Sequence, residues 1–389
     1  MTSLFSPLSV GAYAAEALKS DRRAGDGTMT FPLLGLFGET GSLLSEVKKK
    51  QRDHISFVGY AAAVVEELGD VLWYLTAVAN RSGIALDDIA PRIAQANSEK
   101  AVSDSILLAS LQPDIMPQRG EPTAAFERTL LKLAGSVGIL VADFEEGRFD
   151  QDKTALTLRL AAIMASLIQA ANEAGVTLEA AAIKNLAKIR DRWPSVRACP
   201  DFLDAAALPE EQLPRDLHVE IFEREVRGRT YVFQRCNGLN IGDRLTDNAM
   251  TSDDYRFHDV FHYAYVAVLG WSPVVRALFR LKRKSAAKVD EAQDGARAIL
   301  IEEGITTWIF GQAVNLDLFA GMNRGDLPFD LLKHIRQFVA GYEPESAPLW
   351  LWEEAILQGY EAFRYLRQHR RGILHIDAGQ RQLSIEALP

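Results

Sequence analysis

The stretch that decides the fold reads GLFGETGSLLSEVKKK over residues 35–50 and VVEELGDVLWYLTAVANRSGIALDDIA over residues 64–90. In both segments apolar residues recur at steps of three and four, which is the period of an α-helix with one buried face. Pro32 suits the start of the first helix, and Gly83 suits the end of the second. The two segments therefore predict a pair of helices that can pack antiparallel.

Three acidic residues on these helices are candidates for a metal site. Glu67 and Asp70 are three residues apart and project from one face, while Glu39 lies on the preceding helix. Antiparallel packing would bring the three carboxylates together. Such a cluster repels itself unless a cation neutralises it, and hard oxygen ligands favour Mg²⁺ or Mn²⁺. The alternative is a solvated acidic face, which the apolar residues around Glu67 disfavour.

Length and composition limit the class of protein. A chain of 389 residues exceeds one ordinary core and predicts two or three domains. The net charge of −9 argues against binding to nucleic acid or to anionic membranes. With two cysteines, no basic signal-like N-terminus and no stretch of membrane-spanning length, we expect a soluble, cytoplasmic protein.

An internal repeat relates two regions of the chain. Residues 36–41 resemble residues 133–138, and residues 66–84 resemble residues 158–176. Both regions then reach an Asn-x-x-Lys pattern, at Asn97 to Lys100 and at Asn185 to Lys188. Two helical units of one design are the simplest explanation.

The remaining segments complete the expected architecture. Residues 111–122 carry three prolines and a glycine and indicate a linker. Residues 218–235 alternate as a β-hairpin that turns at Arg227-Gly228. The predicted fold class is mainly α, with two tandem helical modules followed by a mostly helical α+β domain; the domains are 1–110, 122–200 and 210–389. Within the last domain helical patterns lie around 254–269, 288–316, 327–341 and 348–369, and the last fifteen or so residues are expected to form a short tail.

The quoted segments resemble the MazG-like family of nucleoside-triphosphate pyrophosphohydrolases, whose signature is a pair of acidic helix motifs, E-x-x-E and E-x-x-D. The second motif is intact as Glu67-Leu68-Gly69-Asp70, preceded by Glu66. In the first motif Glu39 is present, but Ser42 stands where the second glutamate is expected, and Gly38 stands where a further glutamate often precedes. The site therefore has fewer carboxylates than the family pattern.

The resemblance implies four-helix modules and Mg²⁺-dependent hydrolysis of a nucleoside triphosphate to the monophosphate and pyrophosphate. Glu39, Glu67 and Asp70 would hold the metal, and Glu66 or Glu46 would activate the attacking water. The expected nucleotide contacts come from residues near helix ends, namely Lys49, Asn97, Lys100, Asn185, Lys188 and Arg192.

The second repeat lacks the acidic chemistry. The positions equivalent to Glu39, Glu67 and Asp70 are occupied by Ser136, Arg159 and Ala162. We therefore expect a fused pseudo-dimer in which the second repeat supplies scaffold and nucleotide contacts to one composite site. A purely structural second repeat is the open alternative, and two chains could also associate as a homodimer.

The C-terminal part contains a second constellation. His258 and His262 are one helical turn apart, a spacing that suits a transition metal, and Glu302 and Glu303 lie in a long apolar helix. The same residues could instead form a structural network, for example His258 with Glu302 and Arg297 with Asp259.

Two other functions remain open at the level of sequence. The acidic site, which has fewer carboxylates than the family pattern, could bind a nucleotide as a sensor without hydrolysing it. The C-terminal domain could also be a metal-dependent enzyme that the N-terminal half modulates.

Overall fold

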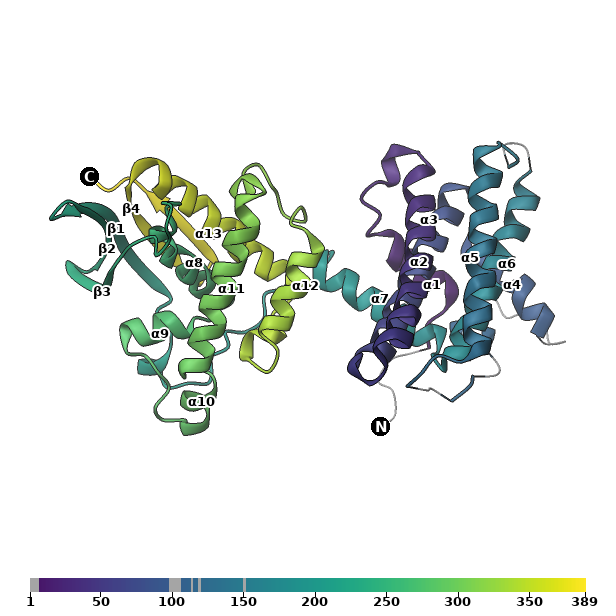
Figure 1. The fold of residues 1–389 in the computed structure, drawn as a ribbon, viewed down its shortest axis with the longest axis horizontal. Coiled ribbons are helices and arrows are strands. Elements are labelled where there is room, and N and C mark those ends of the chain that lie inside the picture. Colours follow the sequence, from purple (N-terminus) through teal and green to yellow (C-terminus); the bar gives the residue numbers. More distant parts are fainter. Residues whose placement is uncertain (1–6, 98–105, 113–114, 118–119, 150–151) are drawn as a thin grey trace. The chain divides into compact units, whose positions relative to one another are not determined.

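The computed structural model describes residues 7–97, 106–112, 115–117, 120–149 and 152–389 (Figure 1). The chain divides into two compact units, Met1–Arg190 and Asp191–Pro389. The first predicted repeat and residues 122–190 of the second fall in the first unit, whereas residues 191–200 and the predicted α+β domain fall in the second. Each unit has its own hydrophobic core.

The regular elements of the first unit are helices, and among its described residues β-pairing is limited to an isolated bridge between Ser9 and Leu107. Its helices are α1 Val10–Leu18, α2 Thr30–Asp53, α3 Tyr60–Arg81, α4 Leu86–Asn97, α5 Ala124–Glu145, α6 Lys153–Ala174 and α7 Leu178–Arg192, of which the last two residues are counted with the second unit. Helices α2 and α3 pack as one hairpin and α5 and α6 as another, and the hairpins pack through α2 with α5 and α3 with α6 (Figure 1). The two repeats therefore share one core.

The ends of α3 and α6 show the repeat in atomic detail. Gly83 and Gly175 follow the two helices with φ of 67° and 69°, the left-handed conformation that glycine adopts without strain. The amide of Ile84 donates to Ala79 at 2.9 Å, and the amide of Val176 donates to Ala171 at 3.0 Å. The same turn geometry thus recurs 92 positions along the chain, in agreement with the predicted tandem modules.

Helix α6 corrects one expectation. It is long and apolar enough to cross a membrane by length and composition, although no stretch of that length was expected. However, 56% of its apolar window is buried inside the protein, where it packs against α3, α4 and α5. Its apolar composition is accounted for by its place in the core of the bundle.

The second unit contains a five-stranded antiparallel sheet with the order β3-β2-β1-β4-β5. Its strands are β1 Asp216–Val226, β2 Arg229–Cys236, β3 Leu239–Leu245, β4 Arg371–Asp377 and β5 Gln382–Glu386. The predicted hairpin is confirmed: Val226 pairs with Arg229, and Arg227 and Gly228 turn the chain with φ of 53° and 75°. Positive φ at both central residues matches the strand twist. The predicted C-terminal tail is wrong, because most of it forms β4 and β5.

The second unit also contains helices, some of which contact the sheet. They are α8 Asp259–Ala264, continued by a π-helical turn Tyr265–Leu269, α9 Pro273–Phe279, α10 Ala287–Ala292, α11 Ala296–Val314, α12 Phe329–Phe338 and α13 Leu349–His369. Helices α8 and α13 pack on each other and on β4 and β5. The four predicted helical regions are confirmed, and the region 288–316 is divided into α10 and α11 at Gly295.

Candidate functional site

Helices α2 and α3 bring the predicted carboxylates together. Glu39 comes from α2, and Glu67 and Asp70 come from successive turns of α3. One carboxylate oxygen from each residue lies within 4.8 Å of the others. The helical spacing accounts for the pair on α3, and the hairpin packing of α2 adds the third.

Burial and mutual repulsion disfavour ionisation of this cluster. Burial first, then the charges of Asp70, Glu39 and Glu66, raise the pKa of Glu67 to about 8. Burial and the charge of Asp70 also raise the pKa of Glu39. The charge of Lys188, a hydrogen bond with Glu67 and a smaller contribution from the Ser42 hydroxyl partly offset this change. Ser42, at the altered motif position, thus interacts with the cluster through its hydroxyl.

One oxygen in the cluster has no hydrogen-bond partner. Among the described residues, Oε2 of Glu67 is buried and unpartnered. A buried carboxylate oxygen in this condition is costly unless a proton or cation reaches it. The donor set is all oxygen, which fits Mg²⁺ or Mn²⁺.

Helix α7 of the second repeat completes the surroundings of Asp70. The side-chain amide of Asn185 donates to Asp70 at 2.9 Å, and the Lys188 ammonium hydrogen-bonds to the other carboxylate oxygen. Burial raises the pKa of Asp70, while Lys188 and Asn185 act in the opposite direction. Two residues from the second repeat therefore contact a carboxylate of the first, although their predicted role toward a nucleotide stays a prediction.

Gly69 allows this close approach. A Cβ at this position would lie 2.6 Å from the carbonyl oxygen of Ala181 and 3.0 Å from Cβ of Asn185. Only a residue without a side chain lets α7 come this near to α3. An isolated glycine inside a helical pattern signals such close packing, but the sequence does not reveal which element approaches.

Tyr13 was not predicted as part of the site. Its hydroxyl donates to Asn185 at 3.2 Å, and its side chain is fully buried. The residue lies on α1, whose sequence shows no polar motif. It orients the amide that contacts Asp70.

The two candidate bases lie in different surroundings. Glu66 has a carboxylate oxygen 3.6 Å from the Lys188 nitrogen and adds its charge to the cluster. Glu46 lies two turns along α2 from Glu39, a rise of about 10 Å, and is paired with Lys49. The geometry favours Glu66 near the cluster. Lys100 and the side chain of Asn97 lie outside the described residues.

Arg192, which the sequence suggested as a nucleotide contact, is buried by contacts within the second unit. It is only 1% exposed in the second unit, and its guanidinium lies 3.0 Å from the carboxylate of Glu353. It also donates to the carbonyl of Leu327, and Glu353 accepts the backbone amides of Gly325 and Leu327. A guanidinium enclosed in this way exposes almost no surface to a nucleotide, which favours a structural role.

The C-terminal constellation is brought together only in part. His258, His262 and Glu303 place one ligand atom each within 4.8 Å of one another. Glu302 instead accepts a hydrogen bond from Nδ1 of His262 and from Ser272 and Val274, so it is not one of the clustered ligands. The sequence suggested two structural pairs instead, His258 with Glu302 and Arg297 with Asp259. In the structure, the carboxylate of Asp259 contacts His258 and Gln234.

The first unit is thus a helical bundle with carboxylates gathered between the helices of one hairpin, a class of protein that builds metal and ligand sites from inward-facing side chains. A family model of the MazG nucleotide pyrophosphohydrolase domain matches residues 29–100, and a model of the MazG C-terminal domain matches residues 198–389. Residues 29–100 therefore belong to the MazG nucleotide pyrophosphohydrolase domain family, and residues 198–389 belong to the MazG C-terminal domain family.

The second match assigns the part of the chain for which the sequence suggested no family. No curated protein and no solved structure matches the chain. The family implies nucleotide pyrophosphohydrolase activity.

Proposed function

We propose that the protein hydrolyses a nucleoside triphosphate to the monophosphate and pyrophosphate in a Mg²⁺-dependent reaction at Glu39, Glu67 and Asp70. The observation that carries this proposal is the buried, unpartnered Oε2 of Glu67 beside two further carboxylates. Because the pKa of Glu67 is raised to about 8, full ionisation of the three carboxylates is unfavourable at neutral pH without a cation. A bound divalent cation would compensate their charges.

The three carboxylates would hold the ion, with Mn²⁺ as an alternative to Mg²⁺. When bound, the cation supplies charge neutralisation to the triphosphate and to the departing pyrophosphate. The proton of the attacking water goes to Glu66, which lies beside the cluster and outside the proposed ligand set. Water forms the new bond to the α-phosphorus, and the bond from that phosphorus to the bridging oxygen breaks to release pyrophosphate.

Helix α7 gives the proposed site its composite character. Lys188 contacts both Asp70 and Glu66, so it holds these carboxylates in place and carries a positive charge at the edge of the cluster. A triphosphate at this edge would gain an ionic contact with the ammonium group. The second repeat thereby contributes to a single site, while its own hairpin has no carboxylates at the equivalent positions.

The test is pyrophosphate release from each nucleoside and deoxynucleoside triphosphate with Mg²⁺, compared between the wild type and Glu67→Gln. We expect the variant to lose at least about a hundredfold in rate, in line with removal of a metal ligand from a hydrolytic centre. Glu145→Gln, a change at an exposed carboxylate at the end of α5, is the matched control and should retain full activity. Equal rates in the wild type and Glu67→Gln would defeat the proposed site.

The serine at position 42 supports a second candidate function, nucleotide binding without hydrolysis. A serine in place of the expected glutamate removes one negative charge from the site, which favours nucleotide binding without turnover. Equilibrium binding of the same nucleotides separates the two functions. Binding without pyrophosphate release, lost in Glu67→Gln, would identify a nucleotide sensor.

A further inference from the structure

His258, His262 and Glu303 form a cluster in the second unit that the proposed hydrolysis does not use. His258 is the N-cap residue of α8, His262 lies within α8, and Glu303 comes from the middle of α11. His262 is 1% exposed and His258 8% exposed, so the imidazoles are buried. Two imidazoles and a carboxylate with converging ligand atoms are a donor set that binds transition metals.

Hydrogen bonds to the far side of each ring determine which nitrogen faces the cluster. Nδ1 of His258 lies 2.9 Å from the carbonyl oxygen of Tyr255, and because a carbonyl only accepts, Nδ1 carries the proton. Nδ1 of His262 lies 2.8 Å from Glu302. An ionised carboxylate likewise only accepts. In the neutral rings Nε2 is therefore the lone-pair nitrogen, and both Nε2 atoms face the cluster.

Glu302 is held firmly in this orienting role. The hydroxyl of Ser272 donates to it at 2.6 Å, and the backbone amide of Val274 donates at 2.8 Å. The carboxylate is fully buried. A carboxylate behind a histidine is the usual outer partner of a metal-binding imidazole, because it fixes the ring and its tautomer.

With both rings neutral, acceptor atoms face one another across the cluster. Oε2 of Glu303 lies 3.6 Å from Nε2 of His262 and 4.0 Å from Nε2 of His258. An oxygen of Asp259 lies 3.1 Å from the same nitrogen of His258. Nε2 of His262 is buried and has no hydrogen-bond partner among the described residues. Lone pairs in this arrangement repel unless a proton or a metal cation lies between them. Burial lowers the pKa of His262, but Glu302 and Glu303 raise it more strongly, so a proton occupies this place in the metal-free protein and a metal ion would displace it.

The surroundings leave one side open. The ring of Tyr255 stacks on His258 at 4.4 Å between centroids, which closes that side. The side chain of Glu303 is 39% exposed, so an ion can reach the cluster past this carboxylate. The Glu303 oxygen lies 3.6–4.0 Å from the two nitrogens, and all three ligand atoms lie within 4.8 Å of one another. Bonds of about 2.0–2.2 Å place neighbouring ligands roughly 3–3.5 Å apart, so the ligands need to move closer by about 1 Å or less.

We propose that His258, His262 and Glu303 bind one divalent transition-metal ion of the Zn²⁺ type, with Asp259 available as a fourth ligand. Imidazole nitrogens distinguish this site from the carboxylate cluster of the first unit, whose all-oxygen donors favour Mg²⁺. The protein would then hold two metal centres of different chemistry. The second site does not depend on the proposed hydrolysis.

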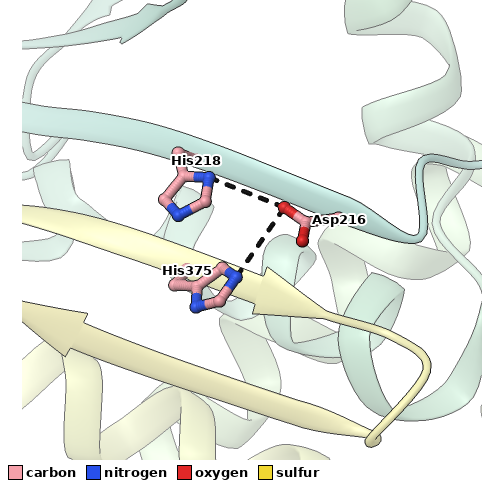
Figure 2. A group of neighbouring side chains, drawn as sticks. All are labelled: Asp216, His218 and His375. Carbon is pink, nitrogen blue, oxygen red and sulfur yellow. Dashed lines mark ion pairs between the residues drawn. The ribbon is translucent and has the colours of Figure 1, made fainter.

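A second histidine cluster provides the control. Asp216, His218 and His375 lie on the neighbouring strands β1 and β4, and Figure 2 shows both imidazoles directed to one Asp216 oxygen. The distances from that oxygen are 3.6 and 3.7 Å, and the two rings stack at 4.2 Å. Their side chains are 58%, 71% and 38% exposed for His218, Asp216 and His375. Mobile, solvated ligands lose more entropy on binding, so this cluster should bind metal more weakly.

The experiment titrates Co²⁺ and then Zn²⁺ into the untagged full-length chain after chelator dialysis. The readouts are the visible absorption of Co²⁺ and isothermal calorimetry. We expect one equivalent of Co²⁺ with the absorption typical of imidazole ligands, displaced by Zn²⁺. His258→Ala and Glu303→Gln should weaken Zn²⁺ binding by at least about tenfold, since loss of an outer partner alone costs about 10–100-fold. The Glu303 side chain is partly exposed, and glutamine has nearly the same shape, so the Glu303→Gln variant should fold like the wild type. Circular dichroism checks this.

Two matched variants assign the signal to its site. His218→Ala removes the surface cluster, and Glu67→Gln removes the carboxylate site; both should leave the Co²⁺ absorption and the Zn²⁺ affinity unchanged. The absence of imidazole-type absorption in the wild type would overturn the proposal. So would loss of the signal in His218→Ala, or wild-type Zn²⁺ affinity in a folded Glu303→Gln chain.

Discussion

Replacing Glu67 by glutamine should stabilise the metal-free protein while removing its response to Mg²⁺. The glutamine keeps the size of the side chain and removes the charge that burial and three neighbouring carboxylates oppose. The metal-free wild type resembles the variant only where Glu67 is protonated. Stability and proposed function therefore make opposite demands on this one position.

The magnitude follows from the pKa of Glu67, which rises from 4.5 to about 8. At about 1.4 kcal/mol per pH unit, ionisation in the folded state costs at most about 5 kcal/mol. Because the side chain is partly exposed, solvent screening reduces this figure, and we expect about 2 kcal/mol. For a unit of this size that corresponds to a Tm higher by about 4–8 °C in the variant.

The direction of the pKa shift of Glu67 determines how the stability difference between the wild type and Glu67→Gln changes with pH. A carboxyl with a raised pKa in the folded state binds its proton more tightly there than in the unfolded chain. Its stabilising contribution is fully present below pH 4.5 and is lost as the pH rises through about 8. The advantage of Glu67→Gln should therefore be near zero at pH 4.5, grow through neutral pH and be nearly complete at pH 9.

The assay is thermal unfolding with a chelator across this pH range, with hydrogen exchange of peptides from α3 to assign the transition to the first unit. Glu145→Gln again serves as the control. At pH 8, Mg²⁺ should raise the Tm of the wild type and leave that of Glu67→Gln unchanged. A variant no more stable than the wild type at pH 9, or an advantage independent of pH, would refute the electrostatic reasoning.

Three further changes test how the site is built. Gly69→Ala should cost about 1–3 kcal/mol of folding free energy in urea unfolding, because the new methyl group overlaps the α7 backbone. Unchanged stability would show that α7 can yield at this point. Lys188→Met should raise KM for the nucleotide in pyrophosphate-release assays, whereas Arg192→Met should cost about 3–5 kcal/mol by breaking a buried ion pair while KM stays near that of the wild type. A raised KM in Arg192→Met alone would reverse this assignment. Ser42→Glu should tighten Mg²⁺ binding by about tenfold in calorimetry, because one more carboxylate adds about 1.4 kcal/mol of attraction; weaker binding would mean that the new side chain does not reach the cluster.

Periodicity was enough to predict most of the helices and the local part of the carboxylate cluster. The spacing of Glu67 and Asp70 puts them on one face of α3 through short-range geometry alone. The turn at Arg227-Gly228 is likewise a local property of two residues with positive φ. The C-terminal strands were missed because β4 pairs with β1, more than 140 residues earlier, and no local signal encodes such a partner.

The tertiary structure decided which residues surround these motifs. The sequence by itself placed Glu39, Glu67 and Asp70 on two helices and marked His258 and His262 as one turn apart, because helical spacing depends only on neighbouring residues. Only the packing of α7 against Gly69 brought Lys188 to Asp70, and only the packing around Glu353 enclosed Arg192. Likewise Glu302 and Glu303 are adjacent in the chain, yet Glu302 contacts Ser272 and Nδ1 of His262, whereas Glu303 faces the Nε2 atoms of both imidazoles. Contacts between distant segments depend on how whole faces bury their apolar surface, and that is a property of the folded chain.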